Sequence, residues 1–284
     1  MNAYKFFILF LIMATSYLSA QFTNVAVTTN SYDQSEQTIA VSPRNTNYIF
    51  AAYNDFRAVG NNYYSKPGYA FSSNAGQTWT EAIVTVPGHL NGFDPSNAFD
   101  NYGNAFYCYL GYRSGPAGNV IVSRTTDLGI QWNHTPISIQ NDLNDKPFMA
   151  IDNTGGSKDG CIYVSWTDFS DYSSLIKFSY STDHGVTFST PITLSSLPFD
   201  PGTGAILKPR NIISENPTAG FVQGSMPAVG SNGEVYVIWA EVPNGGVYNS
   251  ASFKIKKSTD GGLTFGASIT VCQFTARAYS IGAL

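Results

Sequence analysis

Charged side chains are scarce in this sequence. They make up 12% of the 284 residues, about half of the ~25% that is usual for soluble proteins. The net charge is −4, so the chain has no basic footprint and we expect no nucleic acid as a partner. Solubility must therefore depend on uncharged polar residues.

Histidine and cysteine are equally rare, with three of each. The histidines are scattered and the cysteines lie far apart, at Cys108, Cys161 and Cys272. Neither set has the spacing of a zinc site. We expect three buried free thiols, and the alternative is a disulfide between two of them. A Gly-x-Ser-x-Gly elbow and a phosphate-binding loop are also missing. The sequence therefore does not indicate an α/β-hydrolase or a P-loop nucleotide-binding enzyme.

Only one long hydrophobic run is present, the nine residues "FFILFLIMA" from Phe6 to Ala14. Lys5 precedes it, and small residues follow at Ser19 and Ala20. The run is too short to cross a bilayer and has the layout of a signal peptide. We therefore predict a signal peptide over residues 1–20 and a secreted or cell-surface protein, without a transmembrane segment in the mature chain. An uncleaved anchor is the alternative.

The sequence is rich in aromatic residues and contains one pattern four times. Tyrosine and phenylalanine number 18 and 19, and aromatic residues favour β-sheets. The pattern, hydroxyl–x–Asp/Asn–x–Gly–x–x–aromatic, is called the box below: "SSNAGQTW" starts at residue 72, "TTDLGIQW" at 125, "STDHGVTF" at 181 and "STDGGLTF" at 258. Its defining residues are Asn74, Gly76 and Trp79; Asp127, Gly129 and Trp132; Asp183, Gly185 and Phe188; Asp260, Gly262 and Phe265. We expect a turn in which Asp or Asn caps N–H groups two residues on and glycine supplies the positive φ.

Each box is preceded by a similar hairpin, over residues 39–53, 97–109, 149–166 and 227–239. The second strand of each hairpin ends on a large aromatic residue: Tyr53, Tyr109, Trp166 or Trp239. A third strand leads into the box and a fourth follows it. The boxes are 53, 56 and 77 residues apart, near the period of propeller blades. The sequence therefore predicts an all-β propeller over residues 21–284, with four visible blades of four antiparallel strands.

The boxes resemble the Asp boxes, or bacterial neuraminidase repeats, of the sialidase superfamily of β-propellers. The resemblance covers residues 22–270 and implies that the boxes are structural and lie opposite the ligand face. Propellers of this type usually have six blades, so we expect the chain to be the N-terminal part of a six-bladed ring; a closed ring of four is the alternative. On this view residues 22–29 form an outer strand that closes the ring, and a fifth blade begins after Thr270.

On the face away from the boxes, acidic residues recur at equivalent positions. Two residues after each strand-end aromatic stand Asp55, Gly111, Asp168 and Glu241, and Glu36, Asp94 and Asp145 stand where the innermost strands begin. We expect these acids to form a band around the channel mouth. A hydroxyl-rich sugar or a calcium ion would suit such a band, and no other cofactor is required. The alternative is that the acids only cap loops and join neighbouring blades.

Three arginines, Arg57, Arg113 and Arg210, fall on connections assigned to the same face. Arginines bind carboxylates in bidentate fashion, so a trio would suit the carboxylate of sialic acid. The resemblance to active sialidases nevertheless fails where it can be checked. Their Arg-Ile-Pro-like motif is replaced by "EQTIAV", and the loop before the first box, within "RAVGNNYYSKPGYAF", contains no aspartate.

The sequence thus favours a non-catalytic or divergent sialidase-like propeller that binds a glycan or an extracellular protein, or acts as a scaffold. The alternative is a glycoside hydrolase of the exo-α-sialidase type whose nucleophilic tyrosine lies beyond residue 284. The long link from residue 195 to 223 is expected to overhang the ligand face.

Overall fold

The computed structural model describes residues 24–57, 65–113, 118–138, 143–169, 174–195, 221–242 and 251–275. All regular structure in these ranges is β-strand, arranged in four sheets of four strands. The first sheet comprises β1 (Gln34–Val41), β2 (Ile49–Asp55), β3 (Lys66–Ser72) and β4 (Thr80–Ile83); the second comprises β5 (Asn91–Phe99), β6 (Ala105–Tyr112), β7 (Gly118–Thr125) and β8 (Asn133–Pro136). The third comprises β9 (Asn144–Ile151), β10 (Ile162–Asp168), β11 (Leu175–Ser181) and β12 (Ile192–Thr193); the fourth comprises β13 (Phe221–Val229), β14 (Val235–Val242), β15 (Ala251–Ser258) and β16 (Ile269–Phe274).

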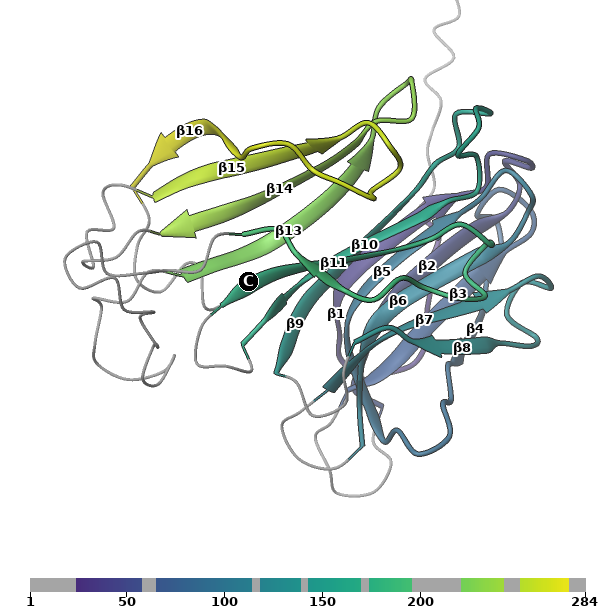
Figure 1. The fold of residues 1–284 in the computed structure, drawn as a ribbon. Helices are drawn as coiled ribbons and strands as arrows, with labels where there is room; N and C mark the ends of the chain where they lie inside the picture. The colour runs from purple at the N-terminus through teal and green to yellow at the C-terminus, as the bar shows by residue number, and fades with distance from the viewer. Residues whose placement is uncertain are drawn as a thin grey trace, which may run out of the picture.

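Each sheet is built from consecutive antiparallel strands, which confirms the all-β blade pattern. The sheets pack in chain order, and the innermost strands β1, β5, β9 and β13 are successive neighbours (Figure 1). Within the described ranges, the first and fourth sheets do not pack against each other. The four sheets therefore form an open arc, and the alternative of a closed four-bladed ring is wrong.

Two expectations about the ends of the arc are also wrong. Residues 24–29 form no strand; Thr28 and Asn30 instead hydrogen-bond to Glu81 on β4 of the first sheet. Residues 271–274 do not begin a fifth blade, because they belong to β16, which pairs with β15 and completes the fourth sheet. The predicted signal peptide, residues 1–20, lies outside the described residues. The described part of the chain contains no helix that is long and apolar enough to span a membrane.

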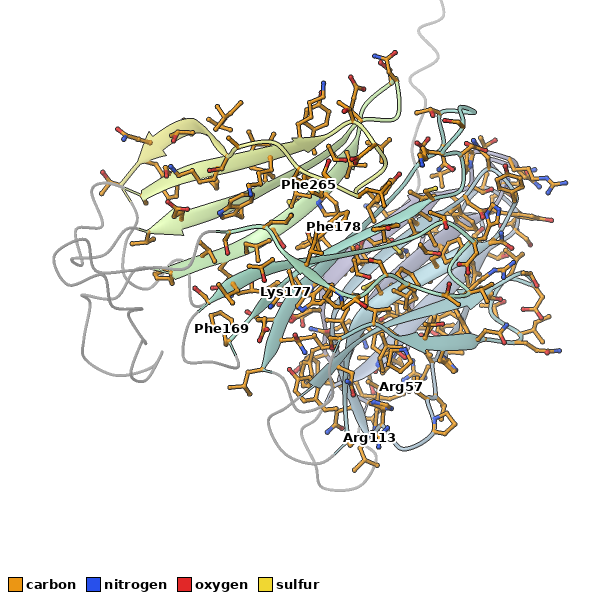
Figure 2. All side chains as sticks on the ribbon, viewed as in Figure 1. Arg57, Arg113, Phe169, Lys177, Phe178 and Phe265 are labelled. Carbon is orange, nitrogen blue, oxygen red and sulfur yellow. The ribbon has the colours of Figure 1, made fainter. Side chains whose placement is uncertain are left out.

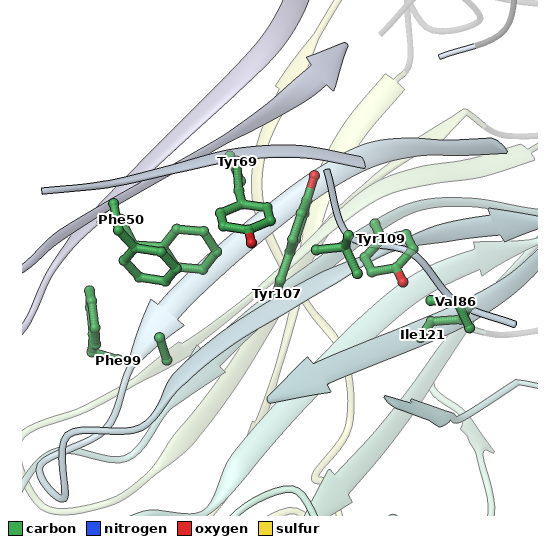
Figure 3. Close-up of a cluster of buried hydrophobic side chains, with 11 residues drawn as sticks. Phe50, Tyr69, Val86, Phe99, Tyr107, Tyr109 and Ile121 are labelled. Carbon is green, nitrogen blue, oxygen red and sulfur yellow. The ribbon is translucent and has the colours of Figure 1, made fainter. Parts of the chain in front are cut away.

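Aromatic side chains fill the interfaces between sheets. Between the first two sheets, Phe50 stacks on Phe71 with ring centroids 4.3 Å apart and meets Tyr107 edge-on at 5.8 Å (Figure 3). The four strand-end aromatics, Tyr53, Tyr109, Trp166 and Trp239, are each at most 2% exposed. Burying a side chain of this size contributes roughly 1.5–3 kcal/mol, so these rings hold the sheets together and are unavailable for stacking on a sugar.

The four boxes form the same turn. In each, the first hydroxyl accepts the N–H of the box glycine at 2.9 Å and donates to the Asp or Asn Oδ1. That Oδ1 accepts the backbone N–H four residues later at 2.9–3.0 Å. The expected cap by Asp or Asn of the N–H two residues on is wrong, because that N–H belongs to the box glycine and the hydroxyl accepts it instead. Asn74 accepts the same backbone N–H and the same hydroxyl as the aspartates do, so the turn needs no negative charge.

The boxes also join neighbouring sheets. A Cβ placed on Gly129 would lie 2.7 Å from Tyr69, and one on Gly262 would lie 2.9 Å from Phe178, each in the preceding sheet. Phe265 of the last box packs edge-on against the same Phe178, with centroids 5.0 Å apart (Figure 2). The box therefore has an architectural role. It lies at the end of each sheet where the innermost strand turns into the second strand, as the Ala75 N–H to Asn47 carbonyl bond shows; this is the box end.

The cysteines follow the expectation only in part. All three are free, and Cys108 and Cys161 are buried, whereas Cys272 is exposed on β16. The expectation of a buried Cys272 is wrong because β16 is the outermost strand of the last sheet.

Candidate functional site

The opposite end of the sheets, where the innermost strands begin, is the top end, and there each innermost strand has a β-bulge. The register shifts between Ser35 and Thr38 in β1 and at the equivalent place in β5, β9 and β13. The first bulge residues have positive φ: Glu36 (53°), Asp94 (56°), Lys146 (47°) and Gly224 (69°). This conformation is uncommon for residues other than glycine and costs roughly 1–2 kcal/mol. Three adjacent strands thus hold a charged residue in the same strained conformation.

The side chains of these three residues meet. The Lys146 ammonium lies 2.5 Å from Glu36 Oε1 and 3.0 Å from Asp94 Oδ1, and the Lys146 backbone N–H donates to Asp94 Oδ2 at 3.2 Å. The Asp94 and Lys146 side chains are 11% and 15% exposed, and that of Glu36 is 39% exposed. The first three sheets are therefore joined by ion pairs at the top end, with Glu36 facing solvent.

Further hydrogen bonds extend this group to all four sheets. Asn54, near the end of β2, donates to Glu36 Oε2 and accepts the Asp94 backbone N–H, each at 3.0 Å. On the other side, the Gln223 amide of β13 donates to the Asp145 carboxylate of β9. The group is called the axial cluster below; it comprises Glu36, Asn54, Asp94, Asp145, Lys146 and Gln223.

The axial cluster contains three carboxyl groups and one ammonium. Burial and a hydrogen bond with Glu36 raise the pKa of Asp94 to about 7, although Lys146 opposes the rise. Burial also acts to raise the pKa of Glu36, but hydrogen bonds with Asp94, Lys146 and Asn54 outweigh it and lower the pKa. Burial raises the pKa of Asp145. Near neutral pH Glu36 is therefore ionised, whereas the neighbouring Asp94 is partly protonated.

The other candidate acids lie in separate ion pairs. Asp55 is fully buried and pairs with Arg57 at 2.6 Å, while Asp168 and Glu241 pair with lysines of their own sheets. Those lysines are Lys177, at 3.8 Å from Asp168 (Figure 2), and Lys254, at 3.7 Å from Glu241. The structure thus brings together Glu36, Asp94 and Asp145, and places the acids that follow the strand-end aromatics in a second set.

The candidate arginines do not join the axial cluster. Arg57 contacts Asp55 and Glu81, which lies 3.4 Å away, so two acids of its own sheet compensate its charge. Arg113 is exposed, and Arg210 lies outside the described residues. Among the described residues, no arginine contacts the axial cluster, so a triple-arginine carboxylate site has no support there.

The axial cluster leaves little space for a calcium ion. The Lys146 ammonium already lies between Glu36 and Asp94, where a cation would sit. The described ranges also contain no group of three or more Asp, Glu, His or Cys side chains arranged to hold a metal. Calcium binding therefore remains a prediction from the sequence that the arrangement of donors does not support.

Lys146 is the residue that the sequence interpretation missed. The structure aligns it, and not Asp145, with Glu36 and Asp94. The signal in the sequence is the proline that follows: Asp94-Pro95 and Lys146-Pro147 are equivalent dipeptides at the bulge. Aligning the prolines would have placed Lys146 in the cluster.

Neither a family model nor a curated protein matches the sequence, but solved structures match the fold. A protein of unknown function from Dyadobacter fermentans gives a TM-score of 0.54 at 15% identity, over 84% of this chain and 69% of that one. The Hadza microbial sialidase Hz136 gives 0.53 at 13% identity, over 84% and 45%. The α-L-arabinanase of Penicillium chrysogenum, solved with arabinobiose, gives 0.55 at 12% identity, over 84% and 68%.

This chain has the fold of a sialidase-like β-propeller. At these identities the likeness establishes the fold alone, and this propeller spans less than half the length of the Hadza sialidase.

Proposed function

We propose that this sialidase-like propeller binds a carbohydrate at the top end, and that the axial cluster is the binding site. The observation that carries the proposal is the common placement of Glu36, Asp94 and Lys146 at the same bulge of three adjacent innermost strands. Carboxylate, ammonium and amide groups set around one axis can donate to and accept from sugar hydroxyls. Such polar groups give a sugar site its orientation and specificity.

The charge of the cluster favours a neutral sugar over a sialic acid. Three carboxyl groups face a single ammonium, and no described arginine lies among them to receive a sugar carboxylate. Like charges brought close together in a partly buried site repel each other. The ligand class that fits is therefore an uncharged glycan, and a sialoside fits poorly.

A glycoside hydrolase acting on neutral glycans is the second candidate. Its support is the pair Glu36 and Asp94, whose pKa values are moved in opposite directions. Two carboxyl groups with separated pKa values are what a glycosidase needs for an acid and a base or nucleophile. In this role Asp94 supplies the proton to the leaving oxygen and the ionised Glu36 acts on the opposite face of the sugar.

The test is a glycan array with the full chain, followed by calorimetry with two probes, arabinobiose and 3′-sialyllactose. We expect neutral glycans to bind, and both Asp94→Asn and Lys146→Met to weaken binding at least tenfold. Asp127→Asn is the matched control, because Asn74 already fills that position in the first box with the same hydrogen bonds. Stronger binding of 3′-sialyllactose, or binding that the axial variants leave unchanged, would contradict the proposal.

Hydrolysis is tested separately by following products from the glycans that bind. Loss of turnover in Asp94→Asn at glycan concentrations that saturate the weakened site would favour the enzyme. Binding by the unmodified protein without any product would favour a binding or scaffolding module.

Export is the remaining part of the proposal. Lys5, the apolar run and the small residues at Ser19 and Ala20 support cleavage after Ala20. Expression of the full chain followed by N-terminal sequencing of the protein in the medium should give a start at Gln21. Retention of the apolar run in a membrane fraction would indicate an uncleaved anchor.

A further inference from the structure

A cavity of about 250 Å³ lies between the first and second sheets at the top end. It forms where the link from β4 passes to β5, and it shares no residue with the axial cluster. Its walls are mostly apolar and include Pro67, Ile83, Val86 and Leu90, with Tyr109 at one side. Figure 3 shows Val86 close to Tyr109 and Ile121. The proposal for the axial cluster does not involve this space.

The cavity coincides with a break in the repeat. The position of Asp55, Asp168 and Glu241 is occupied in the second sheet by Gly111. A Cβ on Gly111 would lie 2.3 Å from Ile121 and 3.0 Å from the His89 ring. His89 therefore lies where the other sheets carry an acidic side chain, and the second sheet has a histidine and a cavity in place of an ion pair.

One polar side chain at the cavity, that of His89, lacks a hydrogen-bond partner. Both ring nitrogens of His89 are shielded from solvent and have no hydrogen-bond partner. An unsatisfied buried polar group costs about 1–3 kcal/mol. The Lys66 ammonium donates to the Leu90 carbonyl, and it forms no ion pair with any described residue. No aspartate or glutamate lines the cavity.

We infer that this cavity binds a small carboxylate with an apolar body. The ligand carboxylate would accept hydrogen bonds from a His89 ring N–H and from the Lys66 ammonium. Its apolar part would pack against Ile83, Val86 and Leu90. Pockets for drug-sized ligands measure about 300–1,000 Å³, so the space suits a molecule with a single ring.

The experiment measures binding of three carboxylates, benzoate, phenylacetate and cyclohexanecarboxylate, and of their uncharged amides to the full chain. Ligand-observed NMR detects binding and calorimetry gives the dissociation constants. We expect at least one carboxylate to bind at least fivefold more tightly than its amide. Lys66→Met and His89→Phe should each weaken that binding at least fivefold, while Lys256→Met on β15 and Asp94→Asn in the axial cluster should leave it unchanged.

Lys66 lies at the rim of the cavity, so Lys66→Met gives a result even if His89→Phe fails to fold, and circular dichroism monitors folding of both. Equal binding of a carboxylate and its amide would overturn the assignment of an anionic ligand. Absence of binding by all three carboxylates, or binding that neither variant weakens, would overturn the site and leave a hydrated space between two sheets.

Discussion

The Lys146 ammonium lies 3.0 Å from the Asp94 carboxylate, across the boundary between the second and third sheets. Both residues occupy the left-handed position of a bulge, which few side chains tolerate without a compensating contact. β5 and β9 each contribute one group to this pair, and the charges can pair only when the second and third sheets are packed side by side. The site and the arc of sheets are therefore expected to form together.

The first prediction concerns the pH dependence of stability. The pKa of Asp94 is about 7 in the folded protein, above its ordinary 3.8. Between these values the folded protein holds a proton that the unfolded chain has lost, so the free energy of unfolding falls as pH rises from about 4 to 7. One pKa unit corresponds to about 1.4 kcal/mol. In urea titrations at several pH values, Asp94→Asn should reduce the total fall between pH 4 and 7 by roughly 2–4 kcal/mol.

Asp127→Asn is the control for that measurement. Hydrogen bonds from the Gln131 N–H and Thr125 lower the pKa of Asp127, so its stabilising effect is present at neutral pH and is lost only below about pH 4. The slope between pH 4 and 7 should survive this substitution. An unchanged slope in Asp94→Asn would show that Asp94 does not carry the proton.

The second prediction compares two equivalent acids, Asp55 and Glu241. Asp55 is fully buried, and it accepts hydrogen bonds from both the side chain and the backbone N–H of Arg57. Asp55→Ala should destabilise the protein by about 2–4 kcal/mol, because it leaves these donors unpaired. The Glu241 side chain is 33% exposed and lies 3.7 Å from Lys254, so Glu241→Ala should cost less than about 1 kcal/mol. Chemical denaturation of the two variants checks the difference, and equal losses would contradict it.

The sequence predicts the four sheets more fully than it predicts the axial cluster. The four boxes and the hairpins before them give the strand order, because turn chemistry and alternating burial are local properties of the sequence. The same local pattern places Tyr53 and Trp166 near the ends of their strands, where the structure buries them. The axial cluster could be predicted only in part, because the bulge residue of β9 that is equivalent to Glu36 and Asp94 is Lys146, one position after Asp145.

The contacts between distant segments could not be read from the sequence at all. Nothing near Gly111 in the chain shows that His89 fills the space above it. The blade pattern predicts a fourth strand after the last box, but it does not show that this strand, β16, continues past Thr270 to Phe274.

The third prediction concerns the thiols. Cys108 is fully buried, and burial raises its pKa; burial also raises the pKa of Cys161. The thiolate is the reactive form, so only the exposed Cys272 should react quickly with Ellman's reagent in the folded protein. We expect one fast thiol per chain under native conditions and three after denaturation. Removal of the fast phase in Cys272→Ser would assign it, and a native titre of three would contradict the burial.

The last prediction uses the box glycines to separate the cost of left-handed backbone strain from the cost of overpacking a Cβ against a neighbouring sheet. Gly76, Gly129 and Gly262 all have φ between 83° and 91°, so alanine at any of them meets the same left-handed strain of roughly 1–2 kcal/mol. A Cβ on Gly76 has its nearest neighbour at 3.6 Å, whereas one on Gly129 or Gly262 lies 2.7–2.9 Å from an aromatic ring of the preceding sheet. Overpacking of this kind costs about 1–3 kcal/mol.

Gly129→Ala and Gly262→Ala should therefore destabilise the protein by about 1–3 kcal/mol more than Gly76→Ala, as measured by urea unfolding. The first box has no preceding sheet in the described part of the chain, so Gly76→Ala reports the backbone strain alone. If all three variants lose the same stability, the boxes act only as turns and do not hold neighbouring sheets together.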